Sequence, residues 1–498
     1  MKKAMTKKVL AVVTTAAMAM SAVACGGSDA ATTAAPAADT TEPAATEEVV
    51  EEAAAEVEEE VEEEEEEVSP YTVITDADGN AIDLGGMEVI VRDWWSPEEP
   101  AEPANDYEEA VDEWRTWAQE TYNFSIKQVA ISDWGTAPQD FVDYVTTGGD
   151  DTNYVFVLRN DPAIVSGMAN GLFYDLSTLD CLDFSSDMFQ KNKTHEMYSK
   201  GSAIYGMAAG PSEARTGVFF NKRLLTEAGI DPESIYDMQA DGTWTWDKFD
   251  ELMGQAQRDT DNDGVDDVYG LTINESVMTD QAVISNGGSY VSKDADGKFV
   301  YNLEAPETQE ALEWCVDMYG KYDNHDPEGA EWDYYKEEFV QGHAAFMVDQ
   351  EYCGTPGNFL ADMEDEVGFV MFPKGPQYDN YINVWDNNLN SIPACYDADR
   401  AWKVAFAWML YNTVPAGYED YNAYLSTARQ GIYDERAVDE TITMMSSAEH
   451  GTVAYHGLVP NLATGPDLTW SVGPGADIAA LTEAISGTWK AYIDEANQ

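Results

Sequence analysis

The sequence lacks the short motifs that mark the common enzyme classes. It contains no HExxH zinc helix and no GxSxG nucleophile elbow. It also contains no phosphate-binding P-loop and no GxGxxG dinucleotide fingerprint. Motif content therefore gives no support for a zinc protease, a serine hydrolase, a P-loop NTPase or a nicotinamide-dependent enzyme, and no catalytic residue is predicted.

Basic residues are scarce. The 498 residues include 26 Lys and Arg against 94 Asp and Glu, which gives a formal net charge of −68. Such a field repels nucleic acid and anionic lipid, and it disfavours anionic ligands unless a local site overrides it. We therefore expect no nucleic-acid partner, and we interpret the acidity mainly as a source of solubility.

Cysteine is also rare, and the five cysteines show no metal-binding spacing. Cys315 falls on the apolar face of a predicted helix, which indicates a buried thiol. The sequence leaves open whether Cys181, Cys315, Cys353 and Cys395 form disulfides.

The N-terminus has the pattern of an export signal. Lysines at positions 2, 3, 7 and 8 precede a mostly apolar run from Val9 to Ala24, which is short for a membrane span. Small residues, then Cys25, then glycine resemble a bacterial lipobox. This resemblance implies that residues 1–24 are a signal peptide and that Cys25 is lipidated; the alternative is an ordinary signal peptide with an incidental cysteine.

The segment that follows cannot form a globular core. Its first part is rich in Ala, Thr and Pro, and Glu47 to Val68 contains fourteen glutamates. Glutamates four residues apart repel one another, which disfavours a stable helix. We predict that residues 25–68 form a disordered tether.

The remaining chain is long enough for two domains and begins with alternating strands and helices. Buried strands are expected at Met87–Arg92, Phe124–Ile131 and Tyr154–Leu158, separated by helices over 107–122 and 139–147. This order is typical of a parallel sheet in an α/β fold.

The stretch Glu213–Thr272 carries a family resemblance. An apolar strand leads into Asn221 and Lys222, a Thr-Trp-Thr-Trp-Asp segment starts a helix, and an aspartate loop ends in Tyr269 and Gly270. Together with the segments Phe339–Val348 and Phe372–Pro376, this order resembles the family 1 extracellular solute-binding proteins of bacterial ABC importers, and it is similar to the maltodextrin-binding proteins.

The resemblance implies a periplasmic-binding-protein-like fold of type II, with two α/β lobes joined by hinge crossings. The first lobe is then expected over 69–212 and 345–412, and the second over 213–344 and 413–498. The implied function is capture of a carbohydrate, an oligosaccharide in particular, and its delivery to the permease subunits of an ABC importer. We expect a monomer that is anchored to the outer face of the cell membrane by lipid.

Candidate ligand contacts come from loops and strand ends. Indole and phenol rings suit the apolar C–H faces of sugars, and planar polar groups pair with sugar hydroxyls. In open α/β sheets ligands bind beyond the carboxyl ends of the strands. The predicted ligand-binding residues are Trp94, Trp95, Trp134, Asn160, Asp161, Glu213, Arg215, Tyr352, Trp385 and Asn387.

The aspartate loop has the spacing of a calcium site. Positions 1, 3, 5 and 9 are Asp259, Asp261, Asp263 and Asp267, and position 7 is Val265, which would contribute its backbone carbonyl. Position 12 is Gly270 rather than a bidentate glutamate, so the loop is not a full EF-hand. We expect one structural Ca²⁺, against the alternative of an acidic turn without metal.

Two other function classes stay open at this point. A peptide or a polyamine could be the captured solute, and the negative charge would suit a cation. A secreted glycoside hydrolase would also be acidic and rich in tryptophan, and it needs two carboxylates that face each other across a cleft.

Overall fold

The computed structural model describes residues 71–498 apart from residues 99–101, 214, 324–330, 332, 386–387 and 463–467. The predicted signal peptide, Cys25 and the predicted tether lie outside the described residues. In the described part, none of the helices combines the length and apolarity needed to cross a membrane.

The first lobe is built on a four-stranded sheet in the order β13-β3-β1-β2. Strands β1 (Met87–Asp93), β2 (Phe124–Ala130) and β3 (Asn153–Leu158) are mutually parallel, and β13 (Leu389–Ser391) is antiparallel to β3. Helices α1 (Asp106–Tyr122), α2 (Ala137–Thr146) and α3 (Pro162–Ala169) follow the three parallel strands. The predicted βαβαβ pattern is therefore confirmed.

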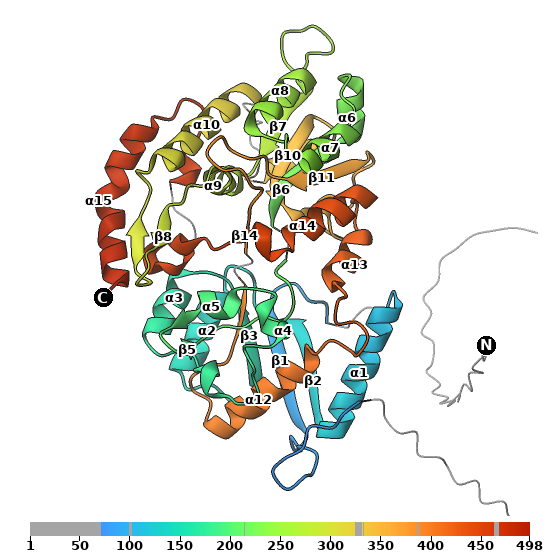
Figure 1. The fold of residues 1–498 in the computed structure, drawn as a ribbon, viewed down its shortest axis with the longest axis vertical. Coiled ribbons are helices and arrows are strands. Elements are labelled where there is room, and N and C mark those ends of the chain that lie inside the picture. The colour runs from blue at the N-terminus through green and yellow to red at the C-terminus, as the bar shows by residue number, and fades with distance from the viewer. Residues whose placement is uncertain are drawn as a thin grey trace, which may run out of the picture. The chain divides into compact units, whose positions relative to one another are not determined.

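Helix α12 (Ala398–Tyr411) completes this lobe from far along the chain (Figure 1). Its buried side chains, Trp408 among them, pack with Val89 and Val91 of β1. On the same sheet, Trp114 of α1 donates its indole N–H to the carbonyl of Leu410 at 2.8 Å. The first sheet is thus covered by helices that are distant from one another in the sequence.

The second lobe has a mixed sheet in the order β11-β6-β10-β7. Strand β6 (Thr216–Asn221) runs antiparallel to both β10 (Ala344–Gln350) and β11 (Val367–Met371), whereas β7 (Tyr269–Ile273) is parallel to β10. The surrounding helices are α6 (Lys222–Glu227), α7 (Glu233–Asp241), α8 (Trp246–Ala256), α9 (Glu275–Ser285), α10 (Pro306–Tyr322) and α11 (Tyr334–Val340).

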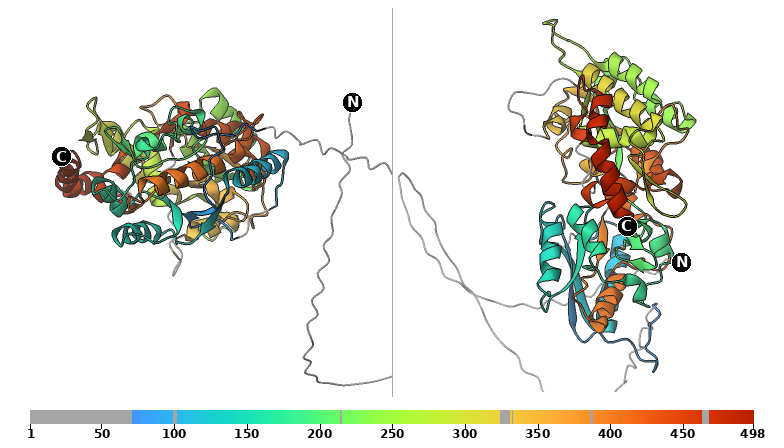
Figure 2. Two further views of the ribbon diagram at one scale, coloured as in Figure 1. Left: turned by 90° about the horizontal axis from the view of Figure 1, so that it is seen from below. Right: turned by 90° about the vertical axis from the view of Figure 1, so that its left-hand side faces the viewer.

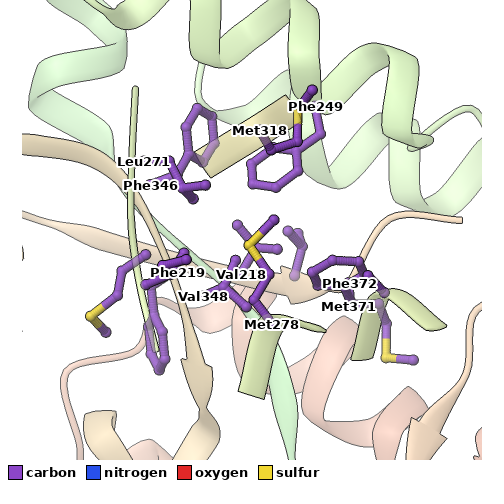
Figure 3. Packing of buried hydrophobic residues seen from close by; sticks show 14 of the residues in the cluster. Val218, Phe219, Phe249, Leu271, Met278, Met318, Phe346, Val348, Met371 and Phe372 are labelled. Carbon is purple, nitrogen blue, oxygen red and sulfur yellow. The ribbon is translucent and has the colours of Figure 1, made fainter. Parts of the chain in front are cut away.

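The core of this lobe is assembled from all four strands and the helices over them. Figure 3 shows Val218 and Phe219 of β6 close to Val348 of β10, with Phe249 of α8 and Met278 of α9 nearby. Gly217 is required in β6, because an added Cβ would lie 2.5 Å from the Phe369 ring and 2.6 Å from the carbonyl oxygen of Val370.

The C-terminal part of the chain contributes two helices to the second lobe, whereas Leu458 packs in a cluster with Phe141 and Ile164 of the first lobe. Helix α13 (Ala423–Arg429) and helix α15 (Ile478–Ala496) contribute Ala428, Trp489 and Ile493 to its core. Figure 2 shows α15, in red, along the flank of this lobe. Three two-stranded ribbons complete the strands: β4 (Ser199–Lys200) with β5 (Ala203–Ile204), β8 (Val291–Lys293) with β9 (Phe299–Tyr301), and β12 (Asn383–Val384) with β14 (Gly451–Thr452).

The expected lobe boundary after residue 344 is wrong. We expected residues 345–412 to return to the first lobe, but β10 and β11 pair within the second sheet, and β12 pairs with β14. Only the part from β13 onward joins the first sheet. The reason is physical: an apolar strand such as Ala344–Val348 fits the interior of either sheet, and its partners are chosen by contacts distant in sequence.

Candidate functional site

The end of β1 forms a tight polar turn that carries two indole rings. Asp93 is fully buried and accepts hydrogen bonds from the Ser96 hydroxyl and from the side chain of Gln128 on β2. This turn directs Trp95 outward, where it is 51% exposed, while Trp94 packs partly against the first core. The two rings meet edge to face with centroids 4.9 Å apart.

A second indole lies after β2 and is stacked by an arginine from the end of β3. Trp134 is 60% exposed, and the Arg159 guanidinium carbon lies 3.8 Å from its ring centroid. Arg159 Nε also donates to the Trp134 carbonyl at 2.9 Å, and Arg159 Nη1 lies 3.3 Å from Asp161 Oδ2. The structure therefore brings the predicted residues Trp134 and Asp161 together through Arg159, which we did not single out.

Asn160 and Asp161 also have structural partners. The Asp161 carboxylate caps helix α3 by accepting from the Ala163 N–H at 2.9 Å. Asn160 is buried and accepts a hydrogen bond from the hydroxyl of Tyr198. Burial raises the pKa of Tyr198, and the charge of Arg215 opposes that rise. Arg215, which precedes β6, thus lies within electrostatic range of the Asn160–Tyr198 pair.

Arg215 is the centre of a charged cluster beside the start of β6 and the end of β10 in the second sheet. Its Nη2 lies 3.8 Å from Glu213 Oε2, and its carbonyl accepts from the Glu351 N–H at 2.9 Å. The Arg215 side chain is largely buried, whereas that of Glu213 is half exposed. Tyr352 follows Glu351 directly and is 37% exposed.

Glu351 is a buried acid in this cluster. It is 1% exposed, and the Tyr433 hydroxyl donates to its Oε1 at 3.1 Å and to its backbone carbonyl. Burial raises the pKa of Glu351 to about 8; the hydrogen bond from Tyr433 and the charge of Arg215 oppose the rise, and the charge of Glu213 adds to it. Glu351 is therefore mostly protonated at neutral pH and can donate a hydrogen bond.

Behind Glu351 lies a second buried acid on β10. Asp349 is 2% exposed and accepts from the Tyr335 hydroxyl at 2.7 Å, and Lys336 Nζ lies 3.8 Å away. Burial raises the pKa of Asp349, and the charge of Lys336 opposes that rise. This network fixes the end of β10 from which Glu351 and Tyr352 project.

Two predicted residues do not join these groups in the described structure. Trp385 is 5% exposed and packs in a core cluster with Phe156 and Leu389. Its ring fills the space beside Gly451, where an added Cβ would lie 2.4 Å from the indole. A ring packed in this way offers no open face to a sugar. Asn387 lies outside the described residues.

The aspartate loop has a donor set that suits a hard cation. One carboxylate oxygen from each of Asp259, Asp261 and Asp267 lies within 4.8 Å of the other two. Asp259 accepts from the Gly264 N–H at 2.8 Å, and Gly264 has a left-handed φ of 95°. Oxygen ligands and a glycine-hinged loop are what Ca²⁺ sites use.

A fourth predicted carboxylate ligand, Asp263, is placed differently. Asp263 is not part of the three-carboxylate group, and its Oδ1 accepts from the Val265 N–H at 2.8 Å. Hydrogen bonds from Thr260 lower the pKa of Asp267, so its carboxylate is ionised at neutral pH. The residues present fit a cation held by the carboxylates of Asp259, Asp261 and Asp267, without Asp263.

The four cysteines in the described part of the chain are free. Cys315 and Cys353 are fully buried, and burial raises the pKa of Cys315 to about 12. The prediction of a buried Cys315 thiol is confirmed.

The family model for bacterial extracellular solute-binding proteins matches residues 197–405. This segment is therefore similar to that family. It includes Tyr198, Glu213, Arg215 and Glu351, so the charged cluster falls inside the solute-binding segment. No functionally curated protein matches the chain in a sequence comparison.

Solved structures show the same fold. UgpB from Mycobacterium tuberculosis, in complex with glycerophosphocholine, is similar with a TM-score of 0.55 and 18% identity; 82% of this chain and 99% of that chain are covered. The cyclic alpha-maltosyl-1,6-maltose binding protein from Arthrobacter globiformis gives 0.54 and 17%, with 83% and 98% covered. The Thermus thermophilus maltotriose binding protein, bound with maltotriose, gives 0.53 and 14%, with 82% and 99% covered.

These comparisons establish the fold class. The chain has the type II periplasmic-binding-protein-like fold that the sequence predicted, and the matched family consists of substrate-binding proteins rather than enzymes. The match of residues 197–405 to this family therefore indicates a solute-binding role.

Proposed function

We propose that this protein captures a carbohydrate, an oligosaccharide in particular, and delivers it to the permease subunits of an ABC importer. The observation that carries the proposal is the pair of exposed indole rings, Trp95 and Trp134, at the carboxyl ends of β1 and β2. Sugar rings lie flat on such surfaces, and they need polar groups within reach of their hydroxyls.

Those polar groups are supplied by both sheets. The first contributes Arg159 and Asp161 beside Trp134, and the second contributes Glu213 and Arg215. Charged side chains that already pair with one another are held in fixed positions, so a sugar meets an ordered set of donors and acceptors. Two of the structural neighbours are maltosyl- or maltotriose-binding proteins, which supports the same class of solute.

The proposal includes an anchor and a metal. A lipid on Cys25 and a tether over residues 26–68 would hold a monomeric receptor at the outer face of the membrane, which suits delivery to a permease. Asp259, Asp261 and Asp267 would hold one structural Ca²⁺. We propose no catalytic residue and no enzymatic activity.

A thermal-shift panel tests the class of solute. Maltooligosaccharides, cyclic glucans, other plant and microbial oligosaccharides, mixed short peptides, spermidine and glycerophosphocholine are each added to the mature protein. The proposal expects a concentration-dependent rise in Tm with at least one glycan, because a ligand that binds only the folded state stabilises it. A rise with peptides or spermidine alone contradicts it, and release of new reducing ends from any glycan contradicts a purely binding role.

A further inference from the structure

A small pocket lies in the second lobe, outside the groups of residues described above. Its volume is about 170 Å³, and it is formed by the end of α9, the turn at Gly287 and Gly288, the start of β8, and residues 452–456. Figure 1 shows α9, β8 and β14 in the same part of the molecule. None of its lining residues belongs to the cluster around Arg215. The lining residues with an acidic or aromatic side chain are Asp280, Tyr290, Tyr378, Tyr455 and His456.

Two buried polar atoms of this pocket have no hydrogen-bond partner outside the Asp280–Tyr290 pair in the described structure. They are the hydroxyl oxygen of Tyr290, whose side chain is 2% exposed, and Oδ1 of Asp280. Each of these groups can form a further hydrogen bond, so a ligand that supplies one is favoured.

The pocket contains an acid, and a lysine from β8 contacts one of its rings: Lys293 Nζ lies 5.1 Å from the Tyr455 ring centroid. Among the described residues no lysine or arginine forms an ion pair with Asp280, and burial raises its pKa to about 7, an effect that Tyr290 opposes. His456 lies edge to face with Tyr290, with ring centroids 5.3 Å apart, and burial lowers its pKa to about 4. The imidazole is therefore neutral and does not compensate the carboxylate.

A more open acidic cleft adjoins the pocket. It has a volume of about 660 Å³ and shares Gly287 and Tyr378 with the pocket. Its lining includes Glu307, Glu310 and Glu313 and no lysine or arginine. Three carboxylates at the approach raise the local concentration of cations over that of anions.

We propose that this pocket binds a small organic ammonium ion, with its N–H groups donating to Asp280 and its methylene groups against the rings of Tyr290 and Tyr378. Aromatic rings beside a carboxylate are the surroundings that organic ammonium ions prefer. Calcium is less suited, because it requires six to eight oxygen ligands and the pocket offers one carboxylate. At about 30 Å³ per water-sized group, the volume accommodates an ion of roughly five heavy atoms.

The probe is therefore n-butylammonium chloride, and the neutral alcohol 1-butanol is its matched comparator. Titration calorimetry at pH 8 and constant ionic strength is expected to show binding of n-butylammonium at one site and none of 1-butanol. Asp280→Asn should weaken the binding about tenfold or more, because it removes the charge with little change of shape. Asp317→Asn removes an exposed carboxylate from α10 and should leave the affinity unchanged.

Tyr378→Leu provides a second variant if Asp280→Asn does not fold, because Tyr378 is 37% exposed and carries less of the core. It should weaken the binding several-fold while the Tm stays close to that of the wild type. Equal binding of 1-butanol, unchanged affinity in both variants, or displacement of n-butylammonium by stoichiometric CaCl₂ would overturn the proposal. The proposal is independent of the proposed carbohydrate function, since Asp280→Asn should leave the response to glycans intact.

Discussion

The guanidinium of Arg159 lies over the indole of Trp134, with its central carbon 3.8 Å from the ring centroid. Arg159 also bonds the Trp134 carbonyl and pairs with Asp161, so one arginine fixes both the ring and the residue that caps α3. An exposed indole held in this way loses little freedom when a ligand stacks on its other face, which favours tight binding.

Trp134→Ala should therefore weaken glycan binding about tenfold to a hundredfold with little loss of stability. The lost ring contact is worth about 1–3 kcal/mol, and the side chain is 60% exposed. Calorimetry with the glycan that gives the largest thermal shift measures the change. Trp402→Ala is the control, because it removes an indole from α12 at the flank of the same sheet. Equal losses in the two variants would argue against a specific role for Trp134.

The buried acid Glu351 makes stability depend on pH. Its pKa is raised to about 8 in the folded state, while the unfolded value is near 4.5. Between these values the folded state binds more protons than the unfolded state, so this group's contribution falls as the pH rises from about 4.5 to 8. Glu351→Gln should remove that loss: the Tm of the variant relative to the wild type is expected to be higher at pH 8 than at pH 5.

Thermal melts of both proteins from pH 4.5 to 8.5 provide the comparison, with the exposed Glu495→Gln as the control. A difference in Tm that does not change with pH would show that Glu351 is ionised throughout.

The aspartate loop predicts a dependence on calcium. Removing Ca²⁺ with EGTA leaves three carboxylates close together without a cation, and the protein should lose about 1–3 kcal/mol of stability, as expected for a site occupied well above its Kd. The measurement is the Tm in excess CaCl₂ and in EGTA. The double variant Asp259→Asn, Asp267→Asn should show no difference between the two conditions, whereas Asp317→Asn should keep it. An identical Tm for the wild type in both conditions would rule out a structural Ca²⁺.

The core of the second lobe should be sensitive to truncation. Phe219 is fully buried, and its ring centroid lies 4.4 Å from that of Phe369 on β11. Phe219→Ala is expected to reduce the free energy of unfolding by about 3–5 kcal/mol, because it leaves a cavity between two strands. Val300→Ala on β9 removes a 38% exposed side chain and should change stability by less than about 0.5 kcal/mol. Similar changes for both would contradict the position of Phe219 in the core.

Much of the fold followed from local patterns. The strands Met87–Arg92 and Tyr154–Leu158 and the helix over 107–122 were predictable, because buried strands read as apolar runs and helices show a 3.6-residue period. The position of β10 in the second sheet was not predictable, although the apolar run that forms this strand was evident in the sequence. Which sheet a buried strand joins depends on partners such as Phe219 and Leu271, which are distant in sequence.

The candidate site was only partly predictable for a related reason. The exposed indoles Trp95 and Trp134 follow strands, and that placement is visible in the sequence. Trp385 has the same local signal, yet its ring packs in the core. Glu351 and Tyr433 were missed, because the pairing of a buried acid with a tyrosine 82 residues away has no local signature. The only available sign was that Glu351 directly follows an apolar strand.

Arg215 tests the central claim most directly, because it lies among Glu213, Glu351 and Tyr198. Titration calorimetry of the wild type and of Arg215→Ala with the best glycan of the panel is the decisive measurement, with Arg429→Ala, an exposed ion-pair variant, as the control. We predict one binding site in the wild type, a loss of affinity of at least about tenfold in Arg215→Ala, and an unchanged Kd in Arg429→Ala. Absence of glycan binding by the wild type, or equal affinity in wild type and Arg215→Ala, would contradict the account.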